Sequence, residues 1–152
     1  MQDANETILF EESLQVPYRY SAGSTVSRFF REIRDHRRIM AIRCDRCRKV
    51  YVPPRSVCGR CFSRLGDWVE LTGAATVASF SFVHYAEPMF PHPPPLCYAL
   101  LRLDGSDGGL VHLLGEVDQD QVRVGLRVEP VFAEEPKGTI LDIRYFKPLL
   151  RA

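Results

Sequence analysis

Two Cys-x-x-Cys pairs constrain this sequence more than any other feature. The first pair is Cys44 and Cys47, and the second, after ten intervening residues, is Cys58 and Cys61. Each pair offers two sulfur ligands from one tight turn, and two such turns can surround an ion tetrahedrally. The spacing therefore predicts a structural zinc site. Because four protein ligands leave no position for water or substrate, this zinc would hold the fold together and perform no chemistry.

Two other roles for these cysteines have to be weighed against zinc. Disulfide pairing is disfavoured because the chain opens with a polar, acidic stretch instead of a secretory signal sequence. A rubredoxin-like iron site uses the same four sulfurs, and spacing alone cannot separate iron from zinc. We favour zinc because the pairs lie among arginines and form a minor part of the chain.

The charge of the chain is distributed unevenly. Of its 152 residues, 45% are hydrophobic and 26% are charged, an ordinary globular balance, and the net charge is +1. Residues 28–64 nevertheless hold twelve basic and three acidic residues, whereas the remainder holds eight basic and sixteen acidic residues. This asymmetry predicts that one end of the molecule faces a phosphate group or an acidic partner, with a solvated arginine face as the alternative.

The pattern of residues predicts a mainly β fold with an N-terminal helix. We expect an arm over residues 1–23, a helix over 24–38 that is N-capped by Ser24, a rubredoxin-like zinc ribbon over 39–67 and an OB-fold barrel over 68–152. In the helix, one of two adjacent phenylalanines should join Val26 and Ile33 in the apolar stripe. The other should pack elsewhere, because neighbouring helical side chains point about 100° apart.

The barrel is predicted from five strand-like segments that follow the ribbon without an intervening helix. Residues 68–71 are expected to start this second sheet-forming region. Between the first two barrel strands, Glu87–Pro95 contains five prolines and cannot form regular structure. The five predicted strands cover residues 75–83, 96–103, 110–117, 127–132 and 140–146.

No catalytic constellation is visible in the sequence. The four histidines, His36, His84, His92 and His112, do not lie at metal-ligand spacing, and Cys97 sits in an apolar strand where a free thiol is usually inert. No run approaches the roughly 18 apolar residues that span a bilayer. We therefore expect a soluble, cytoplasmic chain that makes no membrane contact and has no catalytic residues of its own.

Nucleic-acid binding is one function that a ribbon and an OB barrel can support. Phe80, Phe82, Tyr85 and Tyr98 lie on or beside predicted barrel strands and could stack on bases. Against this function, the barrel is acidic while the basic residues cluster in the helix and ribbon. We keep it as the alternative hypothesis.

Several motifs together resemble a known protein family. They are Ser27-Arg28-Phe29-Phe30, Arg43-Cys44-Asp45-Arg46-Cys47, Tyr51-Val52-Pro53-Pro54-Arg55, Cys58-Gly59-Arg60-Cys61 and Gly73-Ala74-Ala75-Thr76-Val77. This combination resembles the zinc-ribbon and OB-fold family once catalogued as a domain of unknown function. Its members are accessory subunits or domains of thiolases, related acyl-CoA synthases and steroid side-chain aldolases. The opening Tyr18–Gly23 is most similar to members paired with acyl-CoA-degrading thiolases, including the small subunit of benzoylsuccinyl-CoA thiolase.

The resemblance implies a hetero-oligomer with a large thiolase-superfamily subunit. That partner would carry the catalytic cysteine and histidines, and a CoA thioester would be the substrate of the complex. The helix and ribbon would dock on the partner and help to form the passage for CoA. The implied contact residues for partner or CoA are Arg28, Phe29, Phe30, Arg31, Arg34, Arg43 and Arg55, with Met89, Phe90 and His92 of the proline-rich loop near the acyl group. That loop could instead be a rigid solvent loop, and a free-standing acyl-CoA carrier without a large subunit is a third hypothesis.

Overall fold

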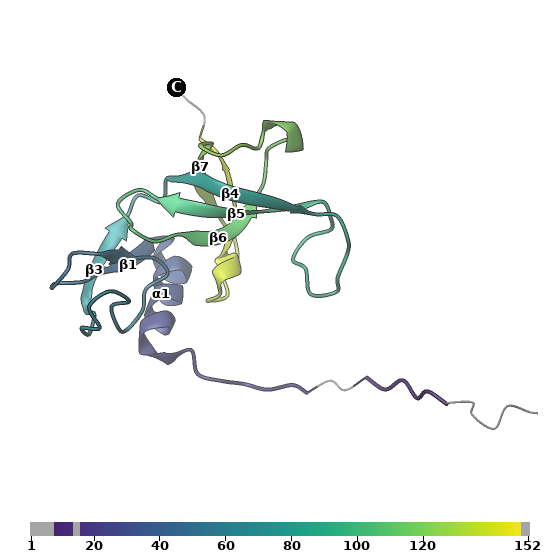
Figure 1. The fold of residues 1–152 in the computed structure, drawn as a ribbon, viewed down its shortest axis with the longest axis horizontal. Helices are drawn as coiled ribbons and strands as arrows, with labels where there is room; N and C mark the ends of the chain where they lie inside the picture. The colour runs from purple at the N-terminus through teal and green to yellow at the C-terminus, as the bar shows by residue number, and fades with distance from the viewer. Residues whose placement is uncertain (1–7, 14–15, 150–152) are drawn as a thin grey trace, which may run out of the picture.

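The computed structural model describes residues 8–13 and 16–149, and it contains one α-helix and two β units (Figure 1). The helix α1 (Gly23–His36) precedes a three-stranded sheet and a closed five-stranded barrel. This arrangement confirms the predicted mainly β fold, with a ribbon followed by an OB-type barrel. The sheet comprises β1 (Ile39–Arg43), β2 (Val50–Tyr51) and β3 (Asp67–Leu71), and the barrel comprises β4 (Ala75–Val83), β5 (Leu96–Leu103), β6 (Leu110–Leu114), β7 (Arg127–Phe132) and β8 (Ile143–Pro148).

The ribbon sheet has the order β2-β1-β3, and both neighbours run antiparallel to β1. Ile42 of β1 pairs with Tyr51 on one side and with Trp68 on the other. The expectation that residues 68–71 begin the second sheet is therefore wrong. After the second cysteine pair the chain returns alongside β1, and β3 completes the ribbon before the chain enters the barrel.

The barrel closes in the order β4-β5-β6-β8-β7, with β6 and β8 parallel and the other pairs antiparallel. Three predicted strand ends are wrong: the end of β6 and both ends of β8, which runs to Pro148 instead of residue 146. β6 stops at Leu114 because Gly115 lies against the Tyr145 ring and Glu116 adopts a left-handed conformation. β8 begins at Ile143, since the three residues before it form the 3-10 turn η2 (Ile140–Asp142). A second 3-10 turn, η1 (Gln119–Gln121), precedes β7.

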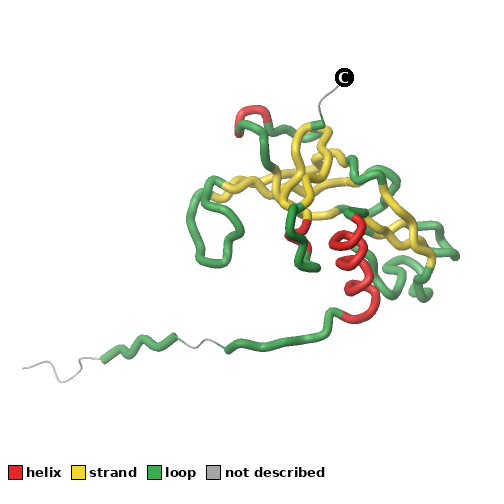
Figure 2. Tube along the Cα trace, turned by 180° about the vertical axis from the view of Figure 1, so that it is seen from behind, coloured by secondary structure: helices red, strands yellow, loops and turns green. Residues whose placement is uncertain are grey.

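The helix α1 lies between the ribbon and the barrel, as seen in Figure 2. It begins at Gly23 and ends at His36, and Arg37 closes it in a left-handed conformation. The predicted N-cap Ser24 is wrong, because Ala22 occupies that position without a side-chain hydrogen bond, and the Ser21 hydroxyl accepts from the Gly23 amide instead.

One hydrophobic core joins all three parts of the molecule. Phe29 and Ile33 of α1, Ile39 of β1 and Leu101 and Phe146 of the barrel belong to the same buried cluster. The ribbon and the helix are therefore packed onto the barrel and are not tethered beside it.

The remaining described segments have no regular structure. Residues 84–95 form an irregular loop, as their prolines predict, and residues 8–13 and 16–22 extend away from the folded part (Figures 1 and 2). The rest of the predicted arm, 1–7 and 14–15, lies outside the described residues. Within the described ranges, no helix combines the length and hydrophobicity needed to cross a bilayer.

Candidate functional site: a four-cysteine centre and two flanking surfaces

The four predicted ligands meet at one point of the ribbon. The Sγ atoms of Cys44, Cys47, Cys58 and Cys61 all lie within 4.8 Å of one another, and the Cys44–Cys61 and Cys47–Cys58 pairs are 3.5 Å apart. A tetrahedral zinc with Zn–S bonds near 2.3 Å requires sulfurs about 3.8 Å apart. The four cysteines therefore fit a site that binds one metal ion through four thiolates. The turn after β1 supplies the first cysteine pair, and the turn before β3 supplies the second.

Neighbouring polar groups support these sulfurs. The Cys47 amide points at Cys44 Sγ and the Arg60 amide at Cys58 Sγ, each at 3.4 Å, and the Ser63 Oγ lies 3.2 Å from both Cys44 and Cys61. Such outer partners orient ligands and offset their negative charge. The Ser63 hydrogen bond is the main cause that lowers the pKa of the Cys44 thiol.

Tyr51 is the outer partner of Cys58. Its hydroxyl lies 3.2 Å from Cys58 Sγ, and this hydrogen bond is the main cause that lowers the pKa of Cys58 to about 5. The Arg55 guanidinium stacks 4.8 Å from the centre of the Tyr51 ring. Tyr51 and Arg55 thus support the metal site, a role that the sequence analysis did not assign to them.

The other arginines proposed for partner or CoA contacts are mostly engaged within the chain. Arg28 stacks 4.4 Å from the Trp68 ring centre, Arg34 pairs with Asp35 at 2.7 Å, and Arg43 pairs with Asp67 at 2.7 Å. Arg31 is exposed and lines a polar hollow on α1 together with Arg28, Glu32, Asp35 and His36. The structure brings Arg28 and Arg31 together and places Arg43 and Arg55 elsewhere, on the ribbon.

The two phenylalanines of α1 separate as their spacing predicts. Phe29 is buried in the core, whereas Phe30 is only partly buried. Phe30 lines an apolar groove of about 420 Å³ between α1 and the barrel. We call this the apolar groove, and its lining residues are Val26, Phe29, Phe30, Pro53, Pro54, Gly109, Leu110, Val111 and Ile140.

The groove is positioned by contacts between the ribbon and the β5–β6 loop. Asp107 in this loop accepts from the Val50 amide at 2.9 Å and pairs with Lys49 at 2.5 Å. The Asp107 amide in turn donates to the Val50 carbonyl. These bonds fix the two prolines of the ribbon beside the start of β6, where Val111 is 62% exposed.

A second apolar hollow continues the groove toward the proline-rich loop. It has a volume of about 280 Å³, shares Val111 and Ile140 with the apolar groove, and is also lined by Met89. Phe90 packs against Tyr85 at 5.7 Å between ring centres, and His92 is exposed. Of the three loop residues proposed for the acyl group, Met89 is therefore the one that the structure brings to this hollow.

The polar groups of the barrel interior have structural partners. The Nε2 of His112 bonds the Ile140 carbonyl at 3.2 Å, and its Nδ1 accepts from the Leu113 amide at 2.8 Å. Burial raises the pKa of the Cys97 thiol, which keeps it protonated near neutral pH. Among the described residues, the four ribbon cysteines are the one group of metal-ligating side chains that could hold an ion.

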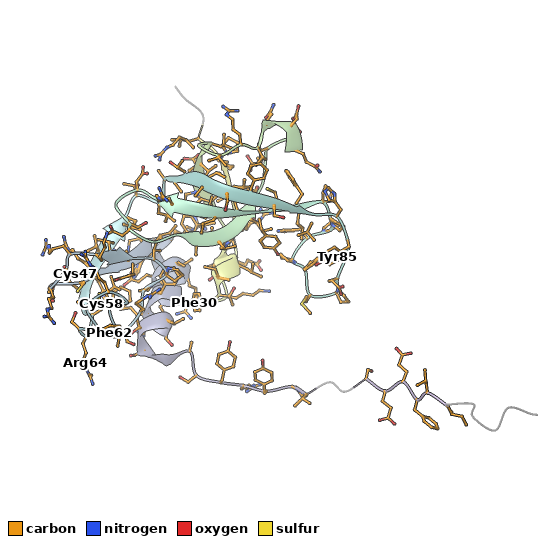
Figure 3. All side chains as sticks on the ribbon, viewed as in Figure 1. Phe30, Cys47, Cys58, Phe62, Arg64 and Tyr85 are labelled. Carbon is orange, nitrogen blue, oxygen red and sulfur yellow. The ribbon has the colours of Figure 1, made fainter. Side chains whose placement is uncertain are left out.

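Tyr85, one aromatic residue of the nucleic-acid hypothesis, is distant from Arg64 of the ribbon. Figure 3 places Tyr85 in the loop on one side of the folded part and Arg64 on the opposite side, near Cys58 and Phe62. A groove for single-stranded nucleic acid needs stacking rings and basic side chains on one surface. The described surface does not combine Tyr85 and the ribbon arginines in this way.

The fold and the four-cysteine centre define the class as a zinc-ribbon protein with a C-terminal OB-fold domain. Comparison with protein families agrees: the ChsH2 rubredoxin-like zinc ribbon domain matches residues 31–66, and the ChsH2 C-terminal OB-fold domain matches residues 68–133. The chain belongs to the family that these two domains make up, the family that the sequence motifs resemble. The zinc ribbon assignment favours zinc over iron at the four thiolates.

Two curated relatives are similar in sequence to this chain. A DUF35 domain-containing scaffold protein of Methanocaldococcus jannaschii is 27% identical over 82% of this chain and 91% of its own length. A probable enoyl-CoA hydratase alpha subunit of Thermomonospora curvata is 28% identical over 78% of this chain. This chain spans only 37% of that second relative.

Solved structures share the fold. The Ltp2-ChsH2(DUF35) aldolase contains a chain that is 26% identical, with a TM-score of 0.63, and the match covers 85% of this chain and 98% of that one. A DUF35-family protein of unknown function from Sulfolobus solfataricus is 25% identical, with a TM-score of 0.60, and the match covers 72% of this chain and 78% of that one.

Proposed function

We propose that this chain is a non-catalytic, zinc-stabilised accessory subunit of a thiolase-type acyl-CoA enzyme of a cytoplasmic degradation pathway. It would help to assemble the complex and form the acyl-CoA passage at the subunit interface. The observation that carries the proposal is the apolar groove, which leaves Phe30 and Val111 partly or largely uncovered by the described chain. An exposed apolar surface of this kind is typical of a protein interaction site.

The comparisons support an accessory role. One relative is described as a scaffold protein, another as a hydratase subunit, and one related structure is an aldolase named for Ltp2 and ChsH2 together. The described residues contribute a closed metal site, a protonated buried thiol at Cys97 and a buried His112 with two hydrogen bonds. We therefore assign the catalytic cysteine and histidines to the large subunit.

We assign the groove and its surroundings two tasks in the complex. The apolar residues around Phe30 and Val111 would contact the large subunit, and the hollow beside Met89 would border the acyl group. Arg28 and Arg31, at the polar hollow on α1, would bind CoA phosphates, because guanidinium groups contact phosphate oxygens in pairs. Arg34, Arg43, Arg55, Phe90 and His92 remain candidate contacts from the family resemblance.

The proposal is tested by copurification with a matched pair of variants. Val111 and Val124 are 62% and 64% exposed, and Val111 lines the groove while Val124 lies between η1 and β7. We expect the wild-type chain, recovered from its native cytosol, to retain a thiolase-superfamily subunit through a salt wash. Val111→Asp should lose that subunit, because a carboxylate cannot be desolvated in an apolar interface. Val124→Asp should retain it.

Activity provides the second readout. The purified complex should cleave carbon–carbon bonds in acyl-CoA substrates, and the small chain alone should not. Full activity of the isolated chain, or retention of the large subunit by Val111→Asp, would contradict the proposal. Recovery of nucleic acid that dissociates steeply with salt would instead favour the alternative hypothesis.

A further inference from the structure

The second zinc-binding turn carries a large aromatic side chain at a position that favours glycine. Phe62 directly follows Cys61, has a left-handed φ of 58°, and is 80% exposed. Its backbone is fixed by the bond from the Phe62 amide to the Cys58 carbonyl at 3.0 Å. Glycine adopts this conformation at a lower cost than any other residue. Because the ring is exposed, burial within this chain does not offset that cost.

Exposed arginines occur in both cysteine turns of the ribbon, two of them within two residues of Phe62 in the sequence. Residues 43–64 include seven basic residues and one acidic residue. Arg43 and Lys49 are paired with Asp67 and Asp107, whereas the arginines that flank the cysteines make no ion pair within the described ranges. We call Phe62 and these arginines the knuckle surface, which comprises Arg46, Arg48, Arg60, Phe62 and Arg64. Figure 3 places Phe62 and Arg64 at the end of the ribbon away from the barrel, and Phe30 nearer the centre.

We infer that the knuckle surface is a second docking surface, which binds an acidic patch on a protein partner with Phe62 inserted into an apolar pocket. The inference rests on the proposed function, because it adds a contact region to the same complex. Aromatic and arginine side chains are the residue types enriched where binding energy concentrates in protein interfaces. The guanidinium groups of the knuckle surface would pair with carboxylates and accelerate association.

A protein patch fits this surface better than a nucleic acid does. Binding of a single strand uses several rings on which successive bases stack. The knuckle surface offers one ring, while Tyr85 lies on the opposite side of the folded part. One exposed ring on a turn that also carries arginines matches a single apolar pocket bordered by carboxylates.

The test uses a substitution that separates docking from folding. Phe62→Gly removes the ring and also relieves the left-handed backbone, so the variant should keep its zinc and melt at the same temperature as the wild type or higher. The probe is the large subunit that copurifies with the wild-type chain, isolated and titrated against each variant. We expect Phe62→Gly to bind about 30-fold more weakly. Phe62→Tyr, which keeps an aromatic ring, should bind like the wild type.

The charge component has its own readout. The double variant Arg60→Glu, Arg64→Glu should associate more slowly, and its association rate should depend less on salt than that of the wild type. In the complex, amide hydrogen exchange of residues 57–64 should be slower than in the free chain.

The outcomes distinguish this inference from the function on which it rests. If Phe62→Gly binds within threefold of the wild type while Val111→Asp does not bind, the accessory role stands and the knuckle surface is not a docking surface. Loss of zinc or a lower melting temperature in Phe62→Gly would show that the ring is structural and would overturn the inference. Phe62-dependent recovery of nucleic acid would overturn it as well, and if no large subunit binds the wild-type chain, both proposals fail.

Discussion

The ribbon and the barrel of this protein are stabilised in different ways, and their surfaces differ accordingly. The barrel is held by alternating strands whose inner residues, such as Leu101, Val128 and Phe146, are fully buried. The ribbon has strands of five residues at most, and two of its turns depend on four sulfurs around one metal ion. Because the metal supplies the structure of those turns, their other residues are free of packing requirements. The knuckle surface, with its arginines and Phe62, occupies those turns.

The two units are nevertheless joined through β1 and α1. Ile39 and Ala41 of β1 lie in the same buried cluster as barrel residues, while Cys44, directly after this strand, belongs to the four-cysteine centre. The comparison therefore teaches that metal and hydrophobic core stabilise opposite ends of the ribbon. A variant at the metal end should leave the core end partly intact.

Substitution of a zinc ligand should produce the largest effect. In Cys44→Ser we expect loss of the metal and unfolding of the two turns, because structural zinc contributes on the order of 10 kcal/mol in small zinc domains. Residues 44–64 should then exchange their amide hydrogens rapidly, whereas β4–β8 should keep slow exchange at a reduced melting temperature. Zinc content and hydrogen exchange by mass spectrometry measure both effects.

Cys97→Ser is the matched control, because Cys97 is a buried thiol of β5 outside the metal site. This variant should keep its full zinc content and lose only the modest stability expected for a polar group in the barrel wall. A metal-free Cys44→Ser protein with the wild-type melting temperature would contradict the role given to zinc. Equal exchange in ribbon and barrel would contradict the distinction between the two units.

An intermediate effect is expected when the hydroxyl next to the metal site is removed. Tyr51→Phe deletes the 3.2 Å hydrogen bond to Cys58 Sγ while the ring under Arg55 remains. Since outer partners of metal ligands influence affinity by about 10- to 100-fold, zinc affinity should fall by about tenfold with little change in fold. Competition with a chelator at fixed pH measures the affinity.

The barrel contains a matched tyrosine. The Tyr145 hydroxyl donates to Glu116 at 2.6 Å, and this bond raises the pKa of Tyr145. Tyr145→Phe should leave zinc affinity unchanged, because it alters a bond of the barrel surface alone. If both tyrosine variants changed the affinity equally, Tyr51 would have no particular role at the metal.

The sequence predicted those features that depend on local pattern. The cysteine spacing predicted the metal centre, and the pattern of strand-like segments predicted β4, β5 and β7 with the bounds that the structure shows. The proline content predicted the irregular loop as Glu87–Pro95; the observed loop, 84–95, ends at the same residue and begins three residues earlier. These features depend on the spacing of residues along the chain. They can therefore be predicted without knowing which segments are in contact in the folded protein.

The features that the sequence did not predict depend on long-range contacts. β3 joins the ribbon because it pairs with β1, 24 to 32 residues earlier, and local pattern does not specify this partner. The apolar groove exists because the β5–β6 loop is bonded to β2. Phe62 could have been noticed from the sequence, since the residue after a Cys-x-x-Cys turn commonly takes a glycine-like conformation, as Arg48 does here.

The smallest effect is expected from an ion pair on the barrel surface. Arg127 contacts both carboxylate oxygens of Asp104 and also donates to Thr76 Oγ1 at 2.8 Å, so it links β7 to β4 and to the turn after β5. The hydrogen bond from Arg127 is the main cause that lowers the pKa of Asp104 in the folded chain. Asp104→Asn removes the charge, and because the pair is exposed the melting temperature should fall by at most about 4 °C at pH 7.

The pH dependence of this difference follows from the direction of the shift. A carboxylate whose pKa is lower in the folded than in the unfolded state stabilises the fold above its unfolded pKa, near 3.9, and this stabilisation is lost as the pH falls through the folded pKa. The difference between wild type and Asp104→Asn should therefore be constant from pH 5 to pH 8 and disappear in acid. Asp45 in the ribbon makes no ion pair within the described part of the chain. Asp45→Asn should therefore have the melting temperature of the wild type both between pH 5 and pH 8 and in acid. A larger effect from Asp45 than from Asp104 would reverse the comparison, because it would place the electrostatic stabilisation in the unit that the metal is expected to hold.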